Sequence, residues 1–163
     1  VFGPAKEAMP EPLQRLHDGD FVEQLSLHFQ VLDVPGHTAG HIAYFAEVPG
    51  EAPVLFCGDT LFSAGCGRLF EGSPAQMLDS LTKLADLPDA TRVCCAHEYT
   101  LGSLRFALAV EPDNADTLAY KTRAEQLRAS QLPSVSLAVR EFDAAALGPV
   151  GVFAALRTWK DEF

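Results

Sequence analysis

The pattern of hydrophobic and polar positions along this chain predicts a mixture of strands and helices, because some segments are strand-like and others have helical periodicity. Short apolar stretches of strand length occupy 42–46, 54–57 and 92–96, and a longer strand-like pattern extends over 21–34. Stretches that are apolar on both faces are typical of a sheet that is covered on both sides. The first twenty residues are rich in proline and glycine and predict a loop.

Helical periodicity predicts four helices among and after these strands. The clearest begins at Ser73, which can cap it, because Pro74 suits the first helical position and Gln76 completes a capping box. Apolar residues then recur every three or four positions up to Ala85, so this helix is expected to lay one face on the sheet. Three more helices are expected at 100–110 with Thr100 as the cap, at 114–130 with Asp113 or Asn114 as the cap, and at 151–161. The order of elements predicts an α/β fold with a more helical C-terminal third.

Composition indicates a globular protein and narrows its partners. The 163 residues are 48% hydrophobic and 21% charged, which excludes a disordered tail. A net charge of −10 argues against a nucleic-acid backbone or an anionic membrane as partner. The longest apolar stretch, 144–156, is too short and too interrupted by glycine and proline to span a bilayer. The four cysteines form no CxxC pair, and we expect free thiols in a reducing, cytoplasmic compartment.

Three segments place metal-ligand side chains directly after apolar strands. His37 and His41 follow the strand-like pattern of 21–34, Asp59 follows 54–57, and His97 follows 92–96. Because ligands gather where the carboxyl ends of strands meet, His37, Asp59 and His97 are expected to lie together. Two imidazoles and a carboxylate suit zinc and similar divalent metals.

The same pattern also has a purely structural interpretation. A single histidine after a strand is more often a hydrogen-bonded structural residue than a ligand, and a Gly-Asp pair is usually a turn. Spacing alone therefore leaves a metal site and a structural role equally open. By the same reasoning, His17 and His28 are expected to be surface residues.

Five motifs occur in order along the chain: PGHTAGH at 35–41, FCGDTLF at 56–62, GCGRLFEG at 65–72, CAHEYT at 95–100 and LRTWKDEF at 156–163. Together they resemble glyoxalase II, the hydroxyacylglutathione hydrolase family of the metallo-β-lactamase superfamily. The resemblance implies an α/β fold, the αββα sandwich of metallo-β-lactamases. This chain would contain its second half, a partial domain over 1–100, and a C-terminal helical glutathione-binding region over 101–163.

The resemblance also implies roles for residues at the predicted site. His37 corresponds to a ligand of one metal ion and His97 to a ligand of a second. Asp59 corresponds to the catalytic carboxylate that bridges both ions. His41 corresponds to a residue that lies beside these ligands and orients them.

Four further residues correspond to the family's substrate-binding positions. Arg68, Arg157 and Lys160 match residues that hold the carboxylates of glutathione, and Tyr99 matches one that hydrogen-bonds glutathione. Arg157 and Lys160 are three positions apart on the last predicted helix, so they share a face. Phe70 stands where some members have tyrosine, so no hydrogen bond is expected from that side chain.

The family's N-terminal HxHxDH motif, which supplies four more metal ligands, is absent from residues 1–34. An intact parent is expected to hold two divalent ions, zinc or else iron or manganese, whereas this chain would hold one or none. The chain is therefore expected to be an incomplete piece with weak or no activity, exposing apolar sheet surface.

For an intact, monomeric parent, the resemblance implies a thioester hydrolase. It would convert an S-(2-hydroxyacyl)glutathione such as S-lactoylglutathione to glutathione and D-lactate, in methylglyoxal detoxification. Two alternatives stay open. One is an iron enzyme that oxidises glutathione persulfides, a family that shares Gly-Cys-Gly-Arg but usually continues differently from 69–72. The other is an inactive remnant that binds at most one weakly held metal.

Overall fold

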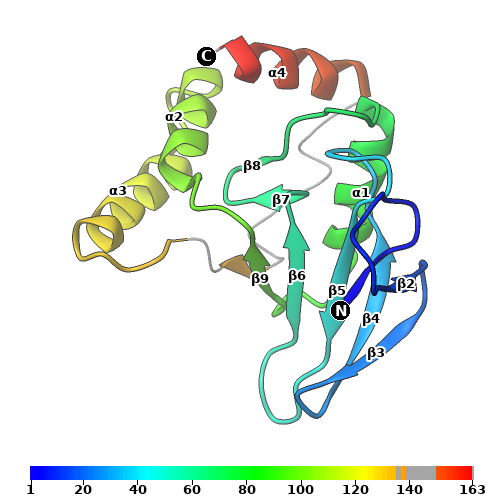
Figure 1. The fold of residues 1–163 in the computed structure, drawn as a ribbon. Coiled ribbons are helices and arrows are strands. Elements are labelled where there is room, and N and C mark those ends of the chain that lie inside the picture. Colours follow the sequence, from blue (N-terminus) through cyan, green and yellow to red (C-terminus); the bar gives the residue numbers. More distant parts are fainter. Residues whose placement is uncertain (135–136, 139–149, 163) are drawn as a thin grey trace.

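The computed structural model describes residues 1–134, 137–138 and 150–162, and its centre is a six-stranded sheet (Figure 1). The strands are β3 (Phe21–Gln24), β4 (Leu27–Asp33), β5 (Ile42–Ala46), β6 (Val54–Gly58), β9 (Arg92–Cys95) and β10 (Leu137–Ala138). Across the sheet their order is β10-β9-β6-β5-β4-β3. All neighbours are antiparallel except β6 and β9, which run parallel. The expected strands at 42–46, 54–57 and 92–96 are therefore confirmed to within a residue.

Two small sheets flank the large one. The first pairs β1 (Phe2–Pro4) with β2 (Gln14–Leu16), so the prediction that the first twenty residues form only a loop is wrong. The second pairs β7 (Leu61–Phe62) with β8 (Gly65–Cys66) directly after β6. This second pair matters for function because it carries the chain from one predicted site motif to the next.

The segment 21–34 is a hairpin of β3 and β4, whereas the apolar pattern predicted one continuous strand-like stretch. The chain reverses at Leu25 and Ser26, which have φ values of 54° and 60°. Turns of this kind usually carry asparagine or glycine, because those residues tolerate positive φ. Neither occurs here, so the turn left no signal in the sequence.

Four helices complete the described chain: α1 (Pro74–Ala85), α2 (Thr100–Val110), α3 (Ala115–Ala129) and α4 (Val150–Glu162). The predicted capping box of α1 is present, with Ser73 and Gln76 each accepting from the other's backbone N–H. Asn114 caps α3 by accepting from Thr117 N, which confirms one of the two predicted caps. Thr100 is the first residue of α2 and not its cap, because that helix starts one residue earlier than predicted.

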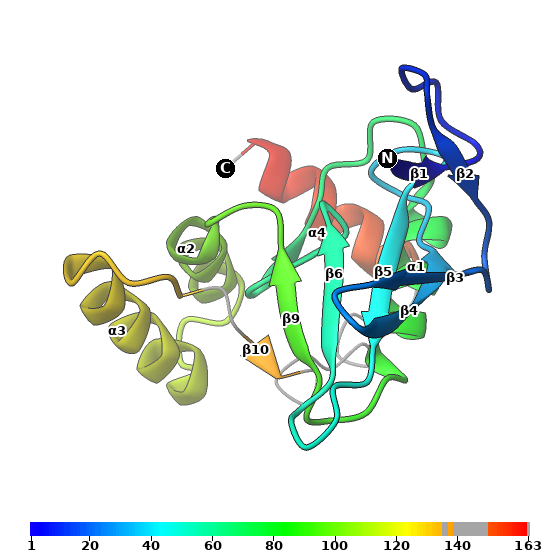
Figure 2. The ribbon, with the colours of Figure 1, turned by 60° about the horizontal axis from the view of Figure 1, so that its bottom comes forward.

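The main core lies between one face of the sheet and helices α1 and α4, which lie behind β5 and β6 in Figure 2. Strand alternation directs one set of side chains to this face, and the apolar positions of α1 meet them as its spacing predicted. The buried members are Leu32, Ala43, Leu55, Cys57, Leu61 and Val93 from the strands, Val34 directly after β4, Met77, Leu81 and Leu84 from α1, and Phe153 from α4.

The opposite face of the sheet is covered only in part. Leu16 of β2 packs there with a small group of strand residues that includes Val31. Phe56, on the same face of β6, is 46% exposed and meets Phe29 with ring centroids 6.0 Å apart. The expectation of a sheet covered on both sides is therefore wrong at β6, and the expected exposure of apolar sheet surface is found there.

The C-terminal part of the described chain is helical, as predicted. Within it, no described helix is long and apolar enough to cross a membrane. The division of the chain at residue 100 falls where β9 gives way to α2, and it stays a prediction.

Candidate metal and substrate site

The three predicted metal ligands line one cleft of about 520 Å³. His37 follows β4, Asp59 follows β6 and His97 follows β9, and these strands end at the same edge of the sheet because they run in the same direction. The full lining comprises His37, Asp59, Phe62, Gly67, Arg68, Phe70, His97 and Tyr99. The structure thus brings the predicted triad together with two of the four predicted substrate-binding residues.

Asp59 and His97 contact each other directly in the cleft. Asp59 Oδ1 lies 3.1 Å from His97 Nε2. The His97 ring stacks on Tyr99 with centroids 4.9 Å apart, and Phe62 meets Tyr99 edge-on at 5.2 Å. These aromatic contacts restrict the orientation of the His97 imidazole and direct its Nε2 atom to the carboxylate.

His37 is oriented by the loop that follows β8. Its Nδ1 atom lies 2.9 Å from the backbone carbonyl oxygen of Arg68, and Phe70 N donates to the His37 carbonyl at 3.1 Å. A carbonyl oxygen can only accept, so Nδ1 is the nitrogen that carries a proton, and in the neutral ring the lone pair is on Nε2. Metal-binding histidines commonly have this arrangement, with one nitrogen held by a carbonyl and the other free for the ion.

His41 supports Asp59 from outside the cleft. Its Nε2 atom accepts a hydrogen bond from Asp59 N at 3.2 Å. Burial lowers the pKa of His41, which keeps its ring neutral and able to accept that bond. His41 thus contacts the backbone of Asp59, and its role of orienting the ligands stays a prediction.

Two carboxylates hold the loop that carries His37 and His41. Glu7 Oε1 accepts from Gly40 N and Glu71 Oε2 accepts from Ala39 N, both at 2.8 Å. Sequence reasoning missed both residues. Glu71 lies within the GCGRLFEG motif, which could have drawn attention to it, whereas Glu7 lies in a segment without any motif.

The donor atoms fit a divalent metal at Asp59 and His97. Two donors about 2.1 Å from one tetrahedral ion lie roughly 3.4 Å apart, close to the observed separation of 3.1 Å. His37 offers a free Nε2 from the wall of the same cleft. Among the described residues, however, no group of three histidine, cysteine, aspartate or glutamate side chains is close enough to hold a metal ion. The described part of the chain therefore supplies a close pair of ligands and a third side chain nearby.

The predicted substrate-binding residues fall into two groups. Arg68 and Tyr99 line the cleft, whereas Arg157 and Lys160 are not part of its lining. Arg157 is 8% exposed and donates to the Cys66 carbonyl of β8 at 3.0 Å. Lys160 donates to Ser103 Oγ of α2 at 3.0 Å, and burial lowers its pKa. These two cations share a face of α4, as predicted, and that face contacts β8 and α2.

The remaining histidines are exposed, as the sequence predicted, whereas only Cys57 of the four cysteines is fully buried. The side chains of His17 and His28 are 69% and 72% exposed. All four cysteines are free. Burial raises the pKa of Cys57 to about 12, so this thiol is protonated and a poor nucleophile at neutral pH.

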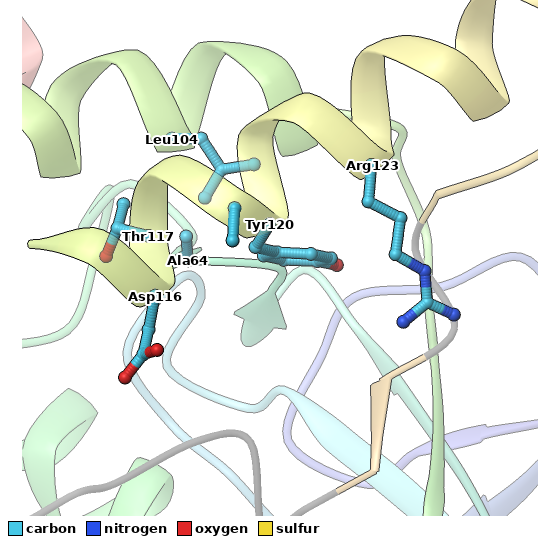
Figure 3. A pocket seen from close by; sticks show the side chains of 7 residues that line it. Ala64, Leu104, Asp116, Thr117, Tyr120 and Arg123 are labelled. Carbon is cyan, nitrogen blue, oxygen red and sulfur yellow. The ribbon is translucent and has the colours of Figure 1, made fainter.

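A second hollow of about 520 Å³ lies beside helix α3, which contributes most of its lining (Figure 3). The lining residues are Ala64, Leu104, Asp116, Thr117, Ala119, Tyr120 and Arg123. The Tyr120 hydroxyl lies 3.0 Å from the Ser134 carbonyl and 3.2 Å from Ser63 Oγ. This lining contains one carboxylate, Asp116, and no histidine or cysteine, whereas the first cleft combines two histidines with Asp59.

Comparison with known proteins divides the chain at the end of β9. Residues 3–97 match the family model of the metallo-beta-lactamase superfamily, and residues 98–142 match that of the hydroxyacylglutathione hydrolase C-terminus. Hydroxyacylglutathione hydrolase of Albidiferax ferrireducens is 59% identical over 185 positions, covering 100% of this chain and 72% of the relative. Hydroxyacylglutathione hydrolase of Cupriavidus metallidurans is 48% identical over 186 positions, covering 100% and 70%. Among solved structures, ETHE1 from Myxococcus xanthus is 39% identical with a TM-score of 0.53, covering 61% of this chain and 43% of that one.

The length of the alignment shows a difference from these relatives. The match to the Albidiferax protein is 185 positions long and this chain has 163 residues, so 22 aligned positions have no counterpart here. The five motifs described in the sequence analysis still occur in order along this chain. Sequence reasoning on the single chain had no signal for it.

Proposed function

Because the chain belongs to the hydroxyacylglutathione hydrolases, a family of thioester hydrolases within the metallo-β-lactamase superfamily, we propose that it acts on an S-(2-hydroxyacyl)glutathione. Hydrolysis of S-lactoylglutathione would give glutathione and D-lactate, which detoxifies methylglyoxal. The observation that carries this proposal is the meeting of His37, Asp59 and His97 with Arg68 and Tyr99 in one cleft.

Membership of this superfamily implies metal ions, and we propose His37, Asp59 and His97 as their ligands. Zinc, iron or manganese would suit the two imidazoles and the carboxylate. A divalent metal, when bound, supplies a water with a pKa lowered to about 7 and hence a nucleophile at neutral pH. The free Nε2 of His37 and the spacing of Asp59 from His97 support this assignment.

We propose that Asp59 is the catalytic carboxylate that holds and orients the attacking water. His41 fixes the backbone of Asp59 through its Nε2 atom, so the carboxylate keeps one position. The leaving group is a thiolate of a thiol with a pKa near 8.5, so hydrolysis needs little help from a general acid. The cleft therefore needs accurate positioning of water and thioester more than a strong proton donor.

The anionic substrate requires local positive charge, because the chain as a whole carries −10. Arg68 lies at the cleft, and its planar guanidinium suits bidentate pairing with a carboxylate of glutathione. Tyr99 lies in the same lining and offers a hydroxyl to the substrate. We propose that Arg157 and Lys160 contribute from α4, through positive charge near β8 and α2.

The proposal also covers the oligomeric state, the cellular compartment and the binding partner of the protein. We propose a monomer in the reducing cytoplasm, an environment in which the four free thiols would persist. A small-molecule glutathione thioester is the proposed partner.

The test is hydrolysis of S-lactoylglutathione by the purified chain with zinc, iron or manganese supplied. We expect slow loss of the thioester above the rate without protein, because residues 1–34 lack the HxHxDH ligands, and D59N should reduce this rate to the background. Asp89, an exposed residue that precedes β9 at the end opposite His97, provides the matched control, and D89N should keep the full rate.

Absence of hydrolysis with all three metals would refute the proposed activity for this chain. Oxygen uptake with a glutathione persulfide, without thioester hydrolysis, would assign the alternative iron enzyme.

A further inference from the structure

Asp161, near the end of α4, contacts two arginines with one carboxylate oxygen. Its Oδ1 atom accepts a hydrogen bond from Nη2 of Arg157, one helical turn earlier, and lies 3.2 Å from Nε of Arg68. The other terminal nitrogen of Arg157 donates to the Cys66 carbonyl at 3.0 Å. A single carboxylate therefore connects the last helix to the loop that borders the cleft.

Burial explains why this carboxylate is needed next to Arg157. The Arg157 side chain is 7% exposed, and a buried guanidinium without a counter-charge is strongly destabilising. Asp161 is 35% exposed and supplies that counter-charge. The Arg68 side chain is 60% exposed, so it remains accessible from the cleft.

The position of the contact on the guanidinium of Arg68 determines which of its nitrogens can bind a ligand. Asp161 contacts Nε, and within the described chain no hydrogen bond or ion pair occupies the two terminal nitrogens of Arg68. Those two nitrogens can together form a bidentate contact with a carboxylate. A guanidinium fixed at Nε thus presents its other edge to a ligand and loses less conformational freedom when the ligand binds.

We propose that Asp161 is a positioning residue that orients Arg68 for a carboxylate group of the substrate. The inference rests on the proposed function and adds a residue that acts on the substrate only through Arg68. Two opposite effects make it testable. Removing a negative charge should strengthen binding of an anion by electrostatics alone, whereas loss of positioning should weaken it.

The test is calorimetric titration of the full chain with S-methylglutathione, a thioether that carries both glutathione carboxylates and cannot be hydrolysed. We expect D161N to weaken binding by about 3- to 10-fold, the range for freeing one ordered side chain. The matched control is E162Q, which removes the same charge at the next, exposed position and should leave binding unchanged or tighter.

A second variant keeps the test informative if D161N does not fold. R68K retains the positive charge in an exposed loop but lacks both the Nε atom that Asp161 contacts and the two terminal nitrogens, so it should weaken binding at least as much as D161N. In the double variant the two effects should not add, because both remove the same contact. Thermal melting followed by circular dichroism verifies that each variant is folded.

The outcomes separate this inference from the proposed function. If the wild type hydrolyses the thioester and D161N binds S-methylglutathione as tightly as E162Q does, the positioning role is wrong and the function stands. A wild type that binds no S-methylglutathione also overturns the positioning role. In the hydrolysis assay, D161N should raise KM and leave kcat unchanged, and a fall in kcat at constant KM would contradict the inference.

Discussion

At the scale of single residues, the site depends on close contacts behind the cleft. Gly58 ends β6 directly before Asp59, with φ of +54°. A Cβ atom added there would lie 2.5 Å from Nε2 of His41, the atom that accepts from Asp59 N. Glycine at this position therefore permits both the backbone conformation and the contact that holds Asp59, the proposed catalytic residue.

We predict that G58A destabilises the protein by about 2–4 kcal/mol, since left-handed backbone strain and a steric clash add together. Urea unfolding measures the loss. G50A is the matched control, because Gly50 also has positive φ (+77°) but nothing lies within 4 Å of its added Cβ. G50A should lower the free energy of unfolding by about 1 kcal/mol, because it introduces the backbone strain without a steric clash. Equal losses for both variants would show that the contact with His41 is unimportant.

The sequence predicted that the proposed ligands lie together, but it did not predict which residues hold them in place. His37, Asp59 and His97 could be expected to meet because each follows an apolar strand, and parallel strand ends share one edge of the sheet. Glu7 and Glu71 accept hydrogen bonds from backbone amides of the loop that carries His37 and His41. These contacts span 33 and 32 residues of sequence. Acidic residues are common, and nothing local distinguishes one that will reach a distant amide.

At the scale of secondary structure, agreement with the sequence was best where a local chemical signal existed. The capping box at Ser73 and Gln76 fixed the start of α1, and the side chain of Asn114 fixed that of α3. The β3–β4 hairpin was missed because Leu25 and Ser26 turn the chain without glycine or asparagine. Tertiary pairing of the two strands outweighs the local preference of these residues.

The turn of this hairpin therefore contains backbone strain that a substitution can relieve. We predict that L25N combined with S26G stabilises the protein by about 1 kcal/mol, because Asn-Gly adopts positive φ at low cost. Leu25 is 90% exposed, so its replacement sacrifices no core packing. The midpoint of urea unfolding should rise. L25A is the control, since it shortens the same exposed side chain but keeps the strain, and a similar rise for it would contradict this explanation.

At the scale of the whole molecule, two family matches meet at one carboxylate. The first match ends at His97 and the second begins at Glu98, three residues after the end of β9. Glu98 accepts from Ser134 N at 2.8 Å and from Ser134 Oγ at 2.7 Å, and Arg128 of α3 lies 3.7 Å away. The end of the sheet that carries His97 is thus tied to the far end of the following helical segment.

We predict that E98Q destabilises the protein by about 1–3 kcal/mol, because an amide can replace only part of a carboxylate that accepts two hydrogen bonds and faces an arginine. Urea unfolding measures the loss, and limited proteolysis should show faster cleavage within α3, since its C-terminal end loses this attachment to β9. E47Q is the matched control: Glu47 is exposed, and its replacement should change neither measurement. Equal cleavage rates in wild type and E98Q would show that contacts between α2 and α3 alone hold the helices in place.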